Sequence, residues 1–159
     1  MTKAKAKDSG ATLVEFAISL SLFLLLILGT MDFAYLFYTK LTLQNAVRQA
    51  GRYAITGQCV PNINGSCKLD RYNSIIQTLQ TASNGLLNSS NSNDISITCT
   101  ANGGGCPNQA GGPGDIITIT VTYTYTFMTA PIAKFFTGGK YVFTVSVAFN
   151  NEPFPPAQS

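Results

Sequence analysis

The sequence predicts an α+β fold in which one long N-terminal helix packs on a small antiparallel sheet. Residues 13–55 lack proline, and apolar residues recur over 33–54 at steps of three and four, which is typical of a helix. Residues after 94 alternate apolar and polar side chains, most clearly over 115–128, which is typical of strands. A small sheet needs a covering layer, and the helix is the element that can supply it.

The first part of this helix is apolar enough to act as a membrane span. Phe16 to Met31 is a run of 16 residues without a charge. As a helix it extends about 24 Å, against about 30 Å of bilayer hydrocarbon. Glu15 or Asp32 must therefore lie at the apolar boundary, where a carboxylate costs free energy. Glu15 is either the last polar residue before the span or a residue with a function there.

The charges before the span predict the orientation of the chain. Residues 1–10 contain three lysines and one aspartate, so the N-terminus is expected in the cytoplasm and the C-terminus outside it. We expect a leader over 1–10 and a long helix over 11–56 whose transmembrane segment is 11–31. No small-residue cleavage pattern follows the span, so the chain is either permanently anchored or trimmed before the span, at Gly10.

Residues 57–159 are expected to form one small extracytoplasmic domain. Its pattern predicts a polar helix over 70–87 and strands over 94–99, 115–128 and 141–149. The loop over 101–114 would let the first two strands pair. The tail after Asn150 contains three prolines, cannot continue a central strand, and is expected to be a solvated terminus.

The outer half of the long helix carries small side chains that let another surface approach closely. That surface is either the sheet of the same domain, which we favour, or a second subunit. The small residues are Ala46, Ala50, Gly51 and Ala54.

All four cysteines follow the span, where the expected topology places them in an oxidising compartment. Disulfides are the natural interpretation, and four cysteines permit three pairings. We favour the two that each enclose a short loop containing Pro, Gly or Asn, namely Cys59 with Cys67 and Cys99 with Cys106.

Composition argues against several classes of function. The net charge of +3 lies largely in the leader, so no basic face for nucleic acid is expected. The chain has no histidine and the cysteine spacings fit no standard zinc site, so no metal, cofactor or small-molecule substrate is predicted. The extracytoplasmic acids are scattered singly rather than paired for acid–base chemistry, so the chain is not expected to be an enzyme.

An ordered residue pattern occupies the first third of the chain and begins with a glycine, four residues, then a glutamate and an aromatic. Its residues are Gly10, Glu15, Phe16, Ala17, Ile18, Gly29, Asp32, Phe33, Leu43, Gln44, Asn45, Ala46, Arg48, the run Ala50-Gly51-Arg52-Tyr53-Ala54, and Gly57. This pattern resembles the TadE-like proteins of tight-adherence (Flp) pilus systems, and a weaker match recurs around Gly114-Asp115 and Glu152.

The resemblance implies a pilin-like fold and a role as a minor pilin or pseudopilin. It implies an inner-membrane, single-pass subunit that helps to assemble a bacterial surface pilus or a related secretion or adhesion apparatus. Its partners would be other pilin-like subunits, the assembly machinery and a prepilin peptidase that cuts between Gly10 and Ala11. Glu15 and Phe16 would then act in subunit assembly, with Glu15 neutralised by the new N-terminal ammonium of a neighbour. The alternative is an uncleaved, single-span binding or adhesion module.

Overall fold

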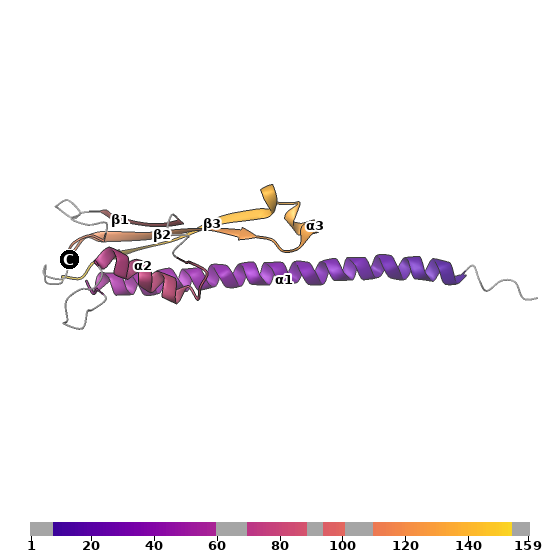
Figure 1. Ribbon diagram of the computed structural model, residues 1–159, viewed down its shortest axis with the longest axis horizontal. Coiled ribbons are helices and arrows are strands. Elements are labelled where there is room, and N and C mark those ends of the chain that lie inside the picture. Colours follow the sequence, from indigo (N-terminus) through magenta and orange to yellow (C-terminus); the bar gives the residue numbers. More distant parts are fainter. Residues whose placement is uncertain (1–7, 60–69, 89–93, 101–109, 154–159) are drawn as a thin grey trace, which may run out of the picture. The chain divides into compact units, whose positions relative to one another are not determined.

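The computed structural model describes residues 8–59, 70–88, 94–100 and 110–153 (Figure 1). In chain order, the long helix α1 and the short helix α2 precede a sheet of order β1-β2-β3, and two short helical turns, α3 and η2, connect β2 to β3. The predicted α+β arrangement of one long helix and a small antiparallel sheet is confirmed. The elements are α1 Asp8–Ile55, α2 Arg71–Ala82, β1 Ile95–Thr100, β2 Ile116–Thr126, α3 Ala130–Ala133, η2 Thr137–Gly139 and β3 Lys140–Asn150.

Helix α1 is uninterrupted over 48 residues and begins three residues before the expected start at residue 11. Its side chains are exposed from Gly10 to Leu28. Beyond that point a buried stripe recurs at steps of three and four residues, which places its members on one face of the helix. The stripe consists of Gly29, Asp32, Leu36, Thr39, Leu43, Ala46, Val47, Ala50, Gly51 and Ala54.

Strands β1 and β2 pair antiparallel, as expected from the loop between them, with Ile95 opposite Val121 and Ile97 opposite Ile119. These apolar pairs share one face of the sheet and are buried. The pairs Ser96–Thr120 and Thr98–Thr118 occupy the other face. The period-two pattern of the sequence therefore separates a buried apolar face from a threonine-rich face.

Helix α2 ends at Ala82, five residues before the end predicted from its pattern. Asn84 and Gly85 have φ angles of 52° and 82°, in the left-handed region that a helix cannot continue through. The Ser83 hydroxyl donates to the Gln80 carbonyl and accepts the Leu87 amide. Apolar Leu87 is thus buried without belonging to the helix. Its apolar side chain explains why the sequence pattern predicts a helix that is too long.

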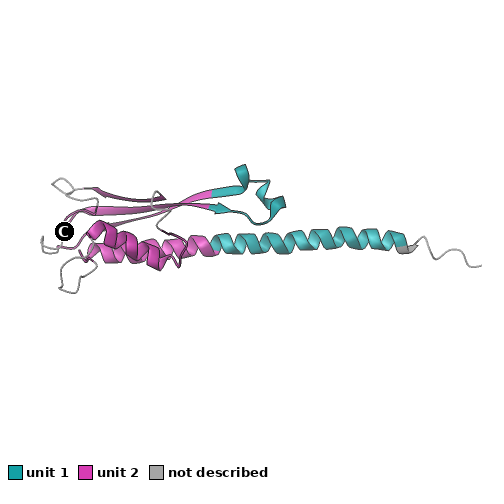
Figure 2. Cartoon of the chain, in the orientation of Figure 1, with its two compact units in different colours: residues 1–37, 125–141 teal, residues 38–124, 142–159 magenta. Residues whose placement is uncertain are grey.

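The chain divides into two compact units, drawn in different colours in Figure 2. Unit 1 comprises residues 1–37 and 125–141, and unit 2 comprises residues 38–124 and 142–159. Unit 1 contains the apolar part of α1 with the connection from β2 to β3. Unit 2 contains the rest of α1, helix α2 and most of the sheet.

In unit 2, the small residues of α1 admit the sheet of the same domain. Ala46, Ala50 and Ala54 are completely buried. A Cβ atom added to Gly51 would overlap the ring of Phe149 on β3. The favoured interpretation of these small residues is therefore confirmed, because the missing Cβ lets an aromatic ring lie directly against the helix backbone.

We expect Gly51→Ala to lower the free energy of unfolding by up to about 2 kcal/mol. Overpacking against Phe149 costs about 1–3 kcal/mol, which exceeds or cancels the gain of about 1 kcal/mol in helix propensity. The measurement is chemical denaturation of the detergent-solubilised protein followed by circular dichroism. In a Phe149→Ala background the same Gly51→Ala change should instead stabilise the protein, and an unchanged sign would contradict the proposed overlap.

Candidate functional site

The first part of α1 presents apolar side chains on every side of the helix. One window within Gly10–Ile55 has a mean hydropathy of 2.4, is long enough to cross a membrane, and has none of its residues buried. A helix that is apolar all round is typical of a membrane span or of a helix surrounded by other apolar helices. The large exposed side chains include Leu13, Phe16, Ile18, Leu22, Phe23, Leu26 and Met31.

Gly10, Ala11, Glu15 and Phe16 all lie in the exposed first turns of α1. A Cβ atom at Gly10 would meet nothing within 4 Å. The Glu15 carboxylate has neither a hydrogen bond nor an ion pair with any residue that the structure describes. Ala11 and Glu15 are four residues apart, so they lie on the same face of the helix, one turn from each other.

At the other end of the apolar run, Asp32 is buried in unit 1 with only 4% of its surface exposed. Its carboxylate accepts hydrogen bonds from the backbone amides of Met128, at 3.2 Å, and Thr129, at 2.9 Å. The Tyr125 hydroxyl donates to the backbone carbonyl of Asp32 at 3.2 Å. These bonds join α1 to the segment that follows β2, and we call them the Asp32 clamp.

The pKa of Asp32 is lowered from its ordinary value of 3.8. Burial by itself would raise the pKa, but the hydrogen bonds from the Thr129 side chain and from the Thr129 and Met128 amides outweigh it. Because the folded-state pKa is the lower one, the clamp adds stability above the ordinary pKa and loses it as pH falls through the lowered value.

Aromatic rings surround the clamp in unit 1. Phe33 on α1 meets Phe127 edge-on at a centroid distance of 6.1 Å, and Tyr35 lies 6.0 Å from Tyr125. Phe127 in turn stacks on Phe136 at 4.3 Å. Phe33 and Tyr35, which the sequence places at the end of the span, therefore pack on the chain's own second segment while remaining half exposed.

Unit 2 contains a second buried charge, Arg71, at the first turn of α2. Its guanidinium donates to the Ala54 carbonyl, at 2.6 Å, and to the Gly111 carbonyl. Burial lowers the pKa of Arg71, and the charge of Asp115 opposes that effect. Arg71 thus satisfies a carbonyl at the C-terminal end of α1, where the helix dipole favours a cation.

The residues around Arg71 correct one expectation about the C-terminal tail. Asn151, expected to be solvated, is only 3% exposed, because its side-chain amide donates to the carbonyls of Ala110 and Gly112. Its backbone amide donates to the Asp115 carbonyl at 2.8 Å, and the amide of Glu152 donates to the Ile55 carbonyl at 3.0 Å. The start of the tail is therefore part of the folded core.

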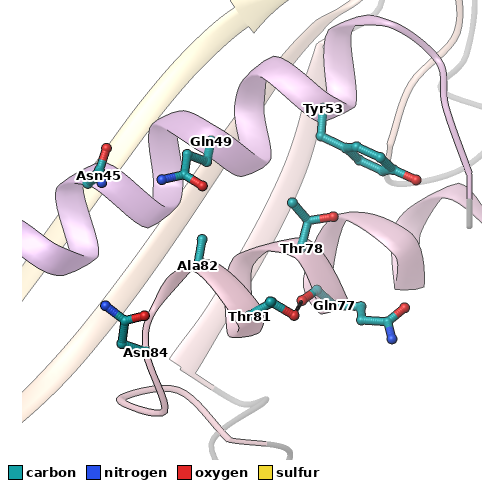
Figure 3. A pocket seen from close by; sticks show the side chains of 8 residues that line it. All are labelled: Asn45, Gln49, Tyr53, Gln77, Thr78, Thr81, Ala82 and Asn84. Carbon is teal, nitrogen blue, oxygen red and sulfur yellow. Dashed lines mark hydrogen bonds between the residues drawn. The ribbon is translucent and has the colours of Figure 1, made fainter.

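A groove of about 710 Å³ lies between α1 and α2 in unit 2 (Figure 3). Its lining is uncharged and polar, so it offers amides and hydroxyls for hydrogen bonding but no charge for ionic recognition. Burial raises the pKa of Tyr53, the one titratable residue in the lining. The residues that line it are Asn45, Gln49, Tyr53, Gln77, Thr78, Thr81, Ala82 and Asn84.

Cys59 and Cys99 are each disulfide-bonded, and none of the described cysteines is free. Cys67 and Cys106 lie outside the described residues. The pairing of Cys59 with Cys67 and of Cys99 with Cys106 therefore stays a prediction.

The sequence singled out Glu15 but did not assign a role to Asp32, Arg71 or Asn151. Asp32 and Asp115 look like scattered boundary acids in the sequence, whereas the structure buries both of them. The position of Asp32 in the sequence did indicate a special role, because a carboxylate next to an apolar run needs hydrogen-bond donors or water. Arg71 and Asn151 carry no such signal, because their partners are backbone atoms far away in the chain.

Comparison with known families identifies the N-terminal segment. The family model described as TadE-like protein matches residues 10–52, which confirms the resemblance over that segment. The match includes Gly10, Glu15 and Asp32, together with Ala46, Ala50 and Gly51 of the small residues on α1. No curated protein and no solved structure matches the chain.

We expect Asp32→Asn to loosen the segment that follows β2 at neutral pH. Replacing a charged acceptor of two backbone amides costs about 1–3 kcal/mol, so exchange of the Met128 and Thr129 amides should accelerate roughly 5- to 150-fold. The measurement is hydrogen exchange of the detergent-solubilised protein, with exposed Asp70→Asn as the control.

The difference in amide exchange between the original protein and Asp32→Asn should depend on pH, in a direction set by the lowered pKa of Asp32. Protonated Asp32 resembles asparagine in charge, so the difference between the original protein and Asp32→Asn should vanish as pH falls through the lowered pKa. A difference in protection that persists undiminished at that acidity would contradict the charged clamp.

Proposed function

We propose that this chain is a pilin-like, membrane-anchored subunit for assembly of a bacterial surface pilus or a related secretion or adhesion apparatus. The observation that carries the proposal is that the TadE-like match, over residues 10–52, includes the part of α1 that is apolar and exposed on every side. Such a segment needs lipid or neighbouring apolar helices around it. A structural, non-catalytic role follows from this interpretation.

In the proposed topology, the N-terminus lies in the cytoplasm and the folded residues after the span lie outside the inner membrane. Support comes from the lysines of residues 1–10 and from the two disulfide-bonded cysteines, which favour an oxidising compartment. Cleavage by a prepilin peptidase would fall between Gly10 and Ala11. Both residues are exposed.

Glu15 is the proposed assembly residue, with Phe16 beside it. The two carboxylates that flank the apolar run differ in their surroundings, since Asp32 is held by two amides while Glu15 has no ionic partner among the described residues. A carboxylate in an apolar setting favours a nearby cation. The ammonium created at Ala11 of a neighbouring subunit is the cation that processing would supply.

The groove between α1 and α2 favours a second candidate function, an uncleaved anchored binding or adhesion module. Its amide and hydroxyl lining suits an uncharged polar ligand. In that case the chain would keep its leader and stay in the membrane, and Glu15 would be dispensable.

Intact-mass and N-terminal analysis of the protein from its own host tests the processing step. We expect a chain that begins at Ala11, present both in membranes and in sheared surface material. A chain that still begins at Met1 and is confined to membranes would contradict processing and would favour the anchored binding module.

We expect Glu15→Gln to leave insertion into the membrane unchanged and to reduce the amount of protein in sheared surface material by about tenfold or more. The reason is that each loss of about 1.4 kcal/mol in subunit association corresponds to a factor of ten. Quantitative immunoblotting of the two fractions measures the effect. Glu152→Gln, an exposed acid in unit 2, is the matched control, and equal amounts from both variants would exclude an assembly role for Glu15.

A further inference from the structure

We propose that the connection from β2 to β3 is a second membrane contact, which rests on the lipid surface beside the transmembrane part of α1. We call residues 128–140 the tip segment. This inference depends on the proposed function in one respect, namely that α1 spans a bilayer. The partner it names is the headgroup layer of that same bilayer, with its anionic lipids.

The first step concerns the depth of the tip segment. In unit 1, a Cβ atom on Gly29 would lie 3.0 Å from Cδ1 of Ile132, so Ile132 packs directly against the backbone of α1 there. Gly29 comes two residues before the end of the uncharged run at Met31, which is about 3 Å along the helix axis. Ile132 is therefore at the level of the last turn of the span.

The same contact leaves an apolar hollow at that level. A cavity of about 410 Å³ lies between the tip segment and α1, and it opens on apolar side chains of the span. The residues that line it are Leu25, Leu26, Gly29, Thr30, Phe33 and Ile132. A hollow of this kind at the end of a span suits an acyl chain or the glycerol region of a lipid.

The second step concerns the exposed apolar residues of the tip segment. Met128 is 85% exposed and Phe135 is 87% exposed. The neighbouring Phe136 behaves differently, because it stacks on Phe127 at a centroid distance of 4.3 Å. The fold thus stacks one of two consecutive phenylalanines on another ring and leaves the other exposed. Water is a poor surrounding for that outward ring, whereas the interfacial region of a bilayer favours aromatic and apolar side chains.

The third step concerns charge. Lys134 and Lys140 are exposed, and the tip segment contains no acidic residue. Lysines beside exposed apolar side chains are the composition of a surface that binds anionic headgroups while its apolar residues enter the boundary region. The long lysine stems let the ammonium groups reach the phosphates from that depth.

Lipid is favoured over another protein because the tip segment is continuous with the proposed span. The uncharged run of α1 extends only about 24 Å, which is shorter than the hydrocarbon layer of about 30 Å. Exposed Met128, whose amide donates to Asp32, adds apolar surface just beyond the end of this run on one side of the helix. This addition lowers the cost of the mismatch between the short run and the bilayer.

The chain contains no tryptophan, so a single introduced tryptophan reports on its own position. We would place Phe135→Trp, Leu22→Trp and Leu41→Trp separately in the full-length protein. The vesicles would contain phosphatidylcholine and phosphatidylglycerol, with lipids carrying a doxyl quencher either near the headgroup, to report on residue 135, or deep in the acyl chain, to report on residue 22. Leu22 lies within the proposed span, and Leu41 is an exposed apolar residue about 15 Å beyond Met31 along α1.

We expect headgroup-proximal quenching and a blue-shifted emission for the tryptophan at 135, and neither for the tryptophan at 41. Replacing Lys134 and Lys140 together with glutamine should reduce the quenching at 135 about twofold or more in vesicles with anionic lipid. The matched replacement of both lysines with arginine should restore it.

Three outcomes would overturn the inference. If the tryptophan at 135 is unquenched while the one at 22 is quenched, the tip segment does not contact the membrane, but α1 still spans it. A blue-shifted but unquenched tryptophan at 135 that depends on the protein-to-lipid ratio would assign the tip segment to a neighbouring subunit. If the tryptophan at 22 is unquenched, α1 does not span the bilayer, and both the proposed membrane-anchored function and the proposed tip contact are wrong.

Discussion

The close approach of α1 to the sheet is the constraint on which the folded part of this chain depends. Three strands do not bury enough apolar surface by themselves, so the helix has to serve as the second layer of the core. The small residues of α1 make this possible, and Gly51 does so most directly by accepting the ring of Phe149 against the helix backbone. Earlier in the chain, residues 10–28 of the same helix are exposed.

The transition between these two environments occurs within a few residues. Leu28 is the last residue of the fully exposed stretch and Gly29 is the first buried one. Asp32 follows almost at once, and its carboxylate is satisfied by two backbone amides rather than by a counter-charge. A charged acceptor of backbone amides forms strong bonds of defined direction, so it fixes the position of the segment after β2 as well as solvating the carboxylate.

Buried polar groups repeat this principle in unit 2. Arg71 satisfies the Ala54 carbonyl at the end of α1, and the Asn151 side chain satisfies the carbonyls of Ala110 and Gly112. In each case a side chain pairs with backbone carbonyls far away in the chain, at the end of α1 for Arg71 and in the turn before β2 for Asn151. Networks of this kind specify which segments of the chain pack together. Leaving a buried polar group without a hydrogen bond costs more free energy than one such bond contributes.

The sequence by itself determined the elements and the character of their surfaces. The apolar run, the absence of proline over residues 13–55 and the alternation over residues 115–128 predicted the long helix and the strands, because helical and extended periods are local properties. The glycine-to-glutamate spacing at Gly10 and Glu15 predicted the TadE-like match for the same reason. Only the tertiary structure decided the roles of Asp32, Arg71 and Asn151, and the end of α2 at Ala82. Their partners lie up to 97 residues away or depend on left-handed backbone at Asn84 and Gly85, and neither long-range contacts nor backbone geometry can be read from a local pattern.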